Sequence, residues 1–166
     1  MASIDKSAFI AEGVRVSGDV TIGKDCSVWY NAVLRASEGS RIVIGDRSNV
    51  QDNCTFHASN GRTVTLGTNV TIGHNAIIHG CTIRDNSVIG MGAIVMNDVI
   101  VEKNCLVGAG ALLTERKVFP EGHLILGSPA KAVRPLTEAE IAGLPNAAAE
   151  YVAASAIEKG KADGAL

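Results

Sequence analysis

Three of the four histidines of this chain fall at positions 57, 74 and 79. A neutral imidazole is a common zinc ligand, and three of them with an open fourth position acidify a bound water. The alternative for each is an ordinary hydrogen-bonded histidine on a β surface. His57 and His79 are 22 residues apart, whereas His74 precedes His79 by five. The elements that carry these side chains decide whether they can share one ion.

These elements follow from a repeat of six residues. An aliphatic residue, or once a phenylalanine, begins each block; four residues are inserted twice and one is omitted once. The fifth position is usually small or a cysteine, with Thr82 there after the omission, and Gly, Asn and Asp recur where tight turns need them. The blocks begin at Ile4, Ile10, Val16, Ile22, Val28, Leu34, Ile44, Val50, Phe56, Leu66, Ile72, Ile78, Ile83, Ile89, Val95, Val101, Val107 and Leu113.

Eighteen such blocks predict a parallel β-helix, because one block makes a short strand and a turn and three blocks complete a triangular coil. So narrow a prism admits small and branched side chains, in agreement with only six aromatic residues among 166. The expected fold is an all-β solenoid of about six coils over residues 1–118. Residues 119–136 are expected to form an exit loop within the same structural domain.

Residues 137–166 are expected to form a C-terminal helical segment that packs on the β-helix. The sequence from Thr137 to Glu140 has the form of a capping box, which predicts a helix start. Pro145 is expected to interrupt this helix, and Asn146 to cap a second segment. The apolar stripe expected to face the β-helix consists of Ile141, Leu144, Ala148, Tyr151, Val152 and Ser155.

The register of the repeat places the three histidines. Three blocks and one four-residue insertion separate His57 from His79, so both lie on one side of the triangle, about 4.8 Å apart between strands. His74 belongs to the preceding side, roughly 16 Å from His79 along the wall. One chain therefore cannot bring all three to one ion, whereas a cyclic trimer in which His74 faces a neighbour's pair can.

Composition excludes several classes of protein. With 46% hydrophobic residues, 19% charged residues and a net charge of −2, the chain is too apolar for disorder and lacks the basic balance of a nucleic-acid binder. It has neither an apolar run long enough to span a membrane nor a signal-peptide core. The four cysteines have no CxxC spacing, which disfavours a disulfide framework or a cysteine zinc site. We expect a soluble, cytoplasmic protein without nucleic-acid or membrane partners.

The chain resembles the γ-class carbonic anhydrases and their relatives in the hexapeptide-repeat superfamily. The resemblance covers roughly residues 8 to 135 and rests on Val28–Arg35, Ile44–Asn53, His57, Ile72–Gly80 and Gly127–Lys131. It implies a left-handed parallel β-helix with a C-terminal α-helix, assembled as a homotrimer with a metal at each interface. The implied metal is Zn²⁺, with Fe²⁺ or Co²⁺ as alternatives.

The implied activity is that of a lyase that hydrates carbon dioxide reversibly by metal-bound hydroxide. His57, His74 and His79 correspond to the metal ligands of the family. Three further residues correspond to its catalytic groups: Arg35 to the arginine that binds bicarbonate and bridges subunits, Gln51 to the residue that orients the hydroxide, and Asp52 to the carboxylate that pairs with the arginine across the interface. The alternatives are an ion pair of Arg35 and Asp52 that serves assembly only, and a polar ladder containing Gln51.

Two departures from the family pattern predict slow turnover. Ser37 stands where the family usually has an aspartate two residues after the arginine, and residues 58–62 contain no acidic proton shuttle. His123 and Tyr151 are the alternative candidates for that shuttle. Two other functions remain open: hydrolysis of an acyl thioester at the same metal site, and a catalytically silent trimeric scaffold. A coenzyme A acyltransferase is disfavoured, because its histidine needs no partners at metal spacing.

Overall fold

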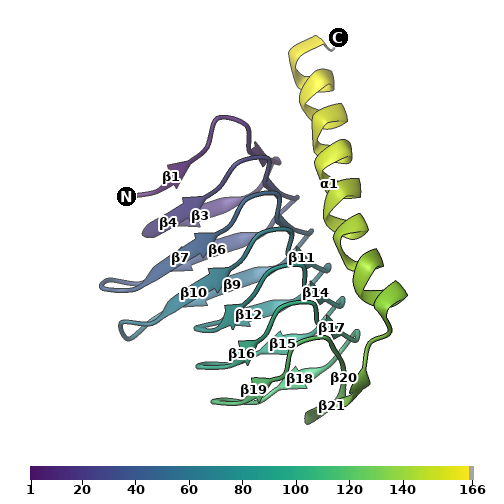
Figure 1. Cartoon of the computed structure of the whole chain (residues 1–166). Coiled ribbons are helices and arrows are strands. Elements are labelled where there is room, and N and C mark those ends of the chain that lie inside the picture. Colours follow the sequence, from purple (N-terminus) through teal and green to yellow (C-terminus); the bar gives the residue numbers. More distant parts are fainter. Residues whose placement is uncertain (165–166) are drawn as a thin grey trace.

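The computed structural model describes residues 1–164, which form a parallel β-solenoid with one long helix beside it (Figure 1). The chain passes through three sheets in turn, so each strand pairs in parallel with the strand one coil further along. This confirms the predicted β-helix. Six complete coils are followed by β19 and β20, which begin a seventh coil beyond the six predicted from the repeat.

The strands belong to three sheets along the solenoid. The first sheet contains β1 (Ser3–Ile4), β4 (Asp19–Ile22), β7 (Arg41–Ile44), β10 (Thr63–Leu66), β13 (Thr82–Ile83), β16 (Ile100–Val101) and β19 (Val118–Phe119). The second contains β2 (Phe9–Ile10), β5 (Ser27–Val28), β8 (Asn49–Val50), β11 (Thr71–Ile72), β14 (Val88–Ile89), β17 (Leu106–Val107), β20 (His123–Gly127) and β21 (Ala130–Pro135). The third contains β3 (Arg15–Ser17), β6 (Val33–Ala36), β9 (Thr55–Ala58), β12 (Ile77–His79), β15 (Ile94–Val95) and β18 (Leu112–Leu113).

The first residues of the blocks form the core. From Ile22 onward they are almost completely buried, whereas Ile4 and Ile10 in the first coil remain exposed because no coil covers them on the outer side. The interior place after the omitted residue differs from the prediction. Cys81 is buried there, while Thr82 pairs with Thr65 on the strand before it and is only half-buried.

The corners use the turn chemistry expected from the repeat. Asn53 and Asn75 have φ angles of 58° and 60°, in the left-handed region that asparagine tolerates well. Elsewhere the coils approach too closely for a side chain: a Cβ on Gly45 would lie 2.4 Å from the carbonyl oxygen of Gly67. These residues hold consecutive coils in register, and therefore fix which outward side chains become neighbours.

Residues 119–136 are not the exit loop that the sequence predicts. β20 pairs in parallel with β17 and so continues the second sheet, and β21 folds back on it in an antiparallel pair. The reason is that β20 would otherwise leave its backbone groups unpaired at the end of the sheet. The solenoid therefore extends to residue 127 before the chain turns toward the helix.

The C-terminal helix α1 (Glu138–Gly164) is continuous, so the predicted interruption at Pro145 is wrong. The capping box forms as expected: the Thr137 backbone N–H donates to Glu140 Oε2 at 2.8 Å, and the Glu140 N–H donates to Thr137 Oγ1 at 3.2 Å. Leu144, Ala148 and Ser155 are buried as the predicted stripe requires, and the helix contacts β2, β5 and β8.

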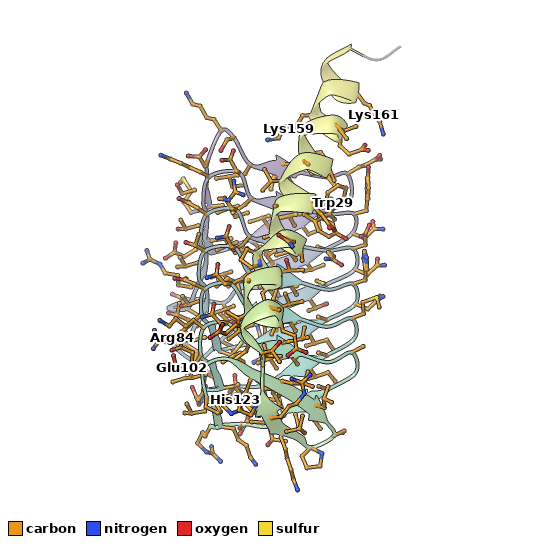
Figure 2. All side chains as sticks on the ribbon, turned by 45° about the vertical axis from the view of Figure 1, so that its right-hand side comes forward. Trp29, Arg84, Glu102, His123, Lys159 and Lys161 are labelled. Carbon is orange, nitrogen blue, oxygen red and sulfur yellow. The ribbon has the colours of Figure 1, made fainter. Side chains whose placement is uncertain are left out.

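This packing against the solenoid keeps α1 continuous at Pro145, although the proline lacks the backbone N–H for one helical hydrogen bond. Figure 2 shows the helix running along the solenoid with Trp29 beside it. Among residues 1–164, no helix has the length and apolarity needed to cross a lipid bilayer.

Candidate metal centre

His57 and His79 meet on the outer face of the third sheet. The register pairs Arg35 with His57 and His57 with His79, on strands β6, β9 and β12. Their chain neighbours Leu34, Phe56 and Ile78 point inward and are completely buried, so these three side chains point outward. His57 Nδ1 lies 2.8 Å from His79 Nε2. The predicted pairing of these two histidines one coil apart is thus confirmed.

His74 lies at the corner between the second and third sheets, two residues after β11. Its Nδ1 is 2.8 Å from Asp52 Oδ2, and its backbone N–H donates to Gln51 Oε1 at 3.2 Å. A carboxylate only accepts hydrogen bonds, so Nδ1 carries the hydrogen and Nε2 of the neutral ring keeps its lone pair. Metal-binding histidines typically donate in this way to a carboxylate, which leaves the other nitrogen free for the metal.

The three histidines do not converge within one chain. Across residues 1–161, whose side chains the structure describes, no three His, Cys, Asp or Glu side chains come together in a way that could hold an ion. The chain instead presents two separate parts: the contacting pair His57 and His79 on one face, and His74 on a corner. That a second subunit completes a three-histidine site stays a prediction.

The donor atoms of the pair fit a metal ion. Two nitrogens at bond lengths of ~2.0–2.1 Å and a tetrahedral angle are about 3.3 Å apart, so the 2.8 Å pair would open by about half an ångström. Burial, followed by the positive charge of Arg35 and by His79, lowers the pKa of His57. His57 is therefore biased toward the neutral form, which is the form that binds metal.

The other predicted catalytic residues have different surroundings. Arg35 is exposed, and no acidic side chain among residues 1–161 forms an ion pair with it. Ser37 Oγ lies 3.1 Å from His57 Nε2, so this residue contacts a histidine rather than the arginine. Gln51 is buried and donates through Nε2 to Asn49 Oδ1 at 3.2 Å. Gln51 therefore belongs to a polar ladder and also holds the backbone of His74.

Both candidate proton shuttles are engaged elsewhere in the chain. The Tyr151 ring packs edge-on against Trp29 with centroids 5.4 Å apart, and burial, reinforced by the negative charge of Asp52, raises its pKa. His123 lies in β20 near the end of the solenoid opposite the N-terminus (Figure 2), where its Nδ1 is 2.8 Å from the carbonyl oxygen of Glu121. Neither residue makes a contact with the histidine pair.

An apolar surface adjoins the histidine pair. Ile77 and Ile94, on neighbouring strands of the third sheet, are 41% and 37% exposed although both are large aliphatic residues. With Met96 they line a hollow that also includes His79 and Asn97. Exposed apolar surface beside polar residues is typical of a protein–protein interface.

Two residues at this site escaped the reasoning from sequence. Asn97 Oδ1 lies 2.7 Å from His79 Nδ1, and Asn97 Nδ2 donates to Glu115 Oε1 at 3.1 Å. Asn97 follows His79 by 18 residues, and Glu115 follows Asn97 by 18, which is the length of one coil of three blocks. The 18-residue spacing could therefore have indicated from the sequence that these side chains lie one above another. The same spacing also relates many surface residues that form no hydrogen bond with each other.

Comparison with known proteins gives matches over the repeats and over most of the chain. Residues 80–115 match the family described as bacterial transferase hexapeptide (six repeats), and residues 63–96 match the hexapeptide repeat of succinyl-transferase. A crystal structure of a hexapeptide transferase family protein from Anaplasma phagocytophilum superposes with a TM-score of 0.88 at 42% identity, covering 93% of this chain and 91% of that one.

Several curated relatives carry names that refer to an activity. A protein of Methanocaldococcus jannaschii named probable carbonic anhydrase is 47% identical over 149 residues, which are 90% of this chain and 93% of the relative. Gamma carbonic anhydrase 1, mitochondrial, of Arabidopsis thaliana is 40% identical over 153 residues, covering 89% of this chain. The chain spans little more than half the length of that relative, 56%.

Proposed function

Because the chain belongs to the γ-carbonic-anhydrase-like family of hexapeptide-repeat proteins, we propose that it catalyses the reversible hydration of carbon dioxide. The observation that carries the proposal is the contact of His57 with His79, at 2.8 Å, on a face where His74 is absent but available on a separate corner. The His57 and His79 pair and the separate His74 can bind one ion together only when the pair of one subunit faces His74 of a neighbouring subunit.

The proposed assembly is a homotrimer with one metal site at each interface. His57 and His79 of one subunit and His74 of the next would hold the ion, and the exposed Ile77 and Ile94 beside the pair support burial of this face. Zn²⁺ is the proposed ion, since three neutral imidazoles suit it, and Fe²⁺ or Co²⁺ suit the same donors. When bound, such an ion acidifies the water it coordinates, so that hydration can proceed near neutral pH.

The chain's own residues would bind the product and orient the ligands. Arg35 lies beside His57 in the register and has an exposed guanidinium, which suits a bidentate hydrogen bond to bicarbonate. Asp52 Oδ2 accepts a hydrogen bond from His74 Nδ1, and Gln51 Oε1 accepts one from the backbone N–H of His74. We propose that these three are the catalytic residues, with Asp52 also able to pair with Arg35 of a neighbouring subunit.

The proposed location is the cytoplasm. All four cysteines, Cys26, Cys54, Cys81 and Cys105, are free thiols and are buried in the solenoid. Free cysteines without a disulfide framework suit a reducing compartment.

The test begins with anaerobic purification, a count of metal per chain and stopped-flow measurement of carbon dioxide hydration with Zn²⁺ and with Fe²⁺. We expect about one metal ion per chain and measurable hydration. Arg35→Gln should retain the metal but lower kcat/KM about ten- to hundredfold, because a charged hydrogen bond to the product is lost. Arg15→Gln, an exposed arginine in β3 on the same sheet, is the matched control and should change neither quantity.

Two results would contradict the proposal. Hydrolysis of an acyl thioester without hydration of carbon dioxide would assign the same site to a different electrophile. Stoichiometric metal with neither reaction would indicate a trimeric scaffold with a structural ion.

A further inference from the structure

A column of polar side chains leads from His79 away from the histidine pair. His79 Nδ1 lies 2.7 Å from Asn97 Oδ1, and Asn97 Nδ2 lies 3.1 Å from Glu115 Oε1. His79 ends β12, Asn97 lies two residues after β15 and Glu115 lies two residues after β18, so the three residues come from three successive coils. None of them is fully buried, yet each has a partner in the column.

The chemistry of the column allows only one arrangement of hydrogens. A carboxylate accepts hydrogen bonds but does not donate them, so the atom of Asn97 that faces Glu115 must be the amide nitrogen. The amide oxygen of Asn97 then faces His79, and because this oxygen is also only an acceptor, His79 Nδ1 must carry the hydrogen. The neutral ring has one hydrogen, so Nε2 keeps its lone pair.

The backbone at Gly80 leaves room for this contact. A Cβ at residue 80 would lie 2.4 Å from Asn97 Oδ1 and 2.8 Å from Arg62 Cδ. Any side chain there would therefore displace the Asn97 amide from His79. Gly80 also has a φ of 54°, in the left-handed region that glycine adopts without strain. The position next to His79 thus has both the space and the backbone conformation that the column requires.

We propose that Asn97 and Glu115 are positioning residues, which fix His79 in the tautomer with hydrogen on Nδ1 and direct its Nε2 lone pair toward His57 and the metal. The inference rests on the proposed metal site and extends it to two residues that do not touch the ion. Glu115 acts through Asn97, and Asn97 acts through His79. Outer partners of this kind usually contribute ten- to hundredfold to metal affinity.

The first measurement is the tautomer of His79 in metal-free protein, by two-bond ¹H–¹⁵N correlation spectra of ¹⁵N-histidine-labelled samples at about pH 8, where free imidazole is neutral. We expect hydrogen on Nδ1 in the unmodified protein. Asn97→Leu, which removes the acceptor at similar size, should shift the population toward hydrogen on Nε2. The double variant Asn97→Asp/Glu115→Gln keeps an acceptor oxygen facing His79 and a hydrogen bond between positions 97 and 115, so it should preserve the Nδ1–H form.

The second measurement is the dissociation constant for Zn²⁺. Asn97→Leu should weaken binding about ten- to hundredfold, with the double variant Asn97→Asp/Glu115→Gln close to the unmodified protein. Glu115→Met should allow the Asn97 amide to rotate and give a mixed His79 tautomer with weaker binding. The matched control is Glu102→Met, since Glu102 is similarly exposed (33% against 37%) but pairs with Arg84. These two residues follow β16 and β13 of the first sheet and are labelled in Figure 2.

The inference is overturned if Asn97→Leu and Glu115→Met both keep the Nδ1–H tautomer and unchanged zinc affinity. If Asn97→Leu fails to fold, Glu115→Met decides alone, because Glu115 lies on the surface. The His79 tautomer is measured without metal or substrate, so this test does not depend on catalysis. The proposed function fails on a different result, the absence of carbon dioxide hydration by the unmodified protein.

Discussion

Two inactive variants are expected to restore each other's metal sites when they share a trimer. His57→Ala removes one member of the contacting pair on the third sheet, and His74→Ala removes the ligand on the corner. Within residues 1–164 the three histidines form no common site, so each complete site would draw on two subunits. Each variant alone should therefore lose metal at every site.

The size of the recovery follows from the division of the site. Equal amounts of the two variants assemble at random into trimers, of which about three quarters contain both kinds of subunit. In every mixed trimer, one interface combines an intact His57 and His79 pair with an intact His74 from the neighbour. One site in three is then complete, so the mixture should hold about one quarter of the metal of the unmodified protein.

The assay is metal per chain, measured after unfolding and refolding the two variants together and separately, with carbon dioxide hydration as a second readout. Mass spectrometry of the native assemblies verifies that mixed trimers have formed. His123→Ala is the matched control: His123, the first residue of β20, contacts the carbonyl oxygen of Glu121, so the variant should retain full metal content.

Two results would refute the reasoning. Mixed trimers that hold no more metal than either variant alone would exclude a site shared in this way. A His74→Ala variant with full metal content would show that His57 and His79 bind the ion without the neighbour.

Three further predictions concern the solenoid and its helix. Phe56→Ala should lower the free energy of unfolding by about 3–5 kcal/mol, because Phe56 is completely buried between coils; a loss below about 1 kcal/mol in denaturant titration would refute this. Burial raises the pKa of Cys26 and Cys54 to about 11 and of Cys81 to about 12, so a thiol reagent at pH 8 should label these residues only after unfolding; rapid labelling of the native protein would contradict the burial. Hydrogen bonds from Arg134 and from the Thr137 backbone lower the pKa of Glu140 from 4.5 to about 2. The stabilising contribution of Glu140 is therefore present above pH 4.5 and disappears as the pH falls toward 2. Glu140→Gln should flatten this part of the curve of unfolding free energy against pH, and an unchanged slope would contradict the prediction.

The repeat in the sequence was sufficient to predict the β-helix and the neighbours of His57. A parallel β-helix pairs residues one coil apart, so the register of the blocks already placed His79 beside His57. The interior cysteines and the asparagine turns were predictable for the same reason, since each position of the block has one environment. The prediction failed where the block was irregular, at the omitted residue that puts Cys81 inside in place of Thr82.

The tertiary structure alone decided how polar side chains meet between coils. Equal spacing puts many side chains one above another, and only their directions determine that His74 bonds to Asp52, that Ser37 contacts His57, and that Asn97 reaches His79. The continuity of α1 through Pro145 likewise depends on packing against the second sheet, which local sequence rules do not contain. The sequence by itself determined the positions of the histidines on the solenoid, because register is a property of the repeat. Hydrogen-bond direction depends on side-chain rotamers and on neighbours from other coils, so the structure was needed to find which nitrogen of His74 and of His79 keeps its lone pair.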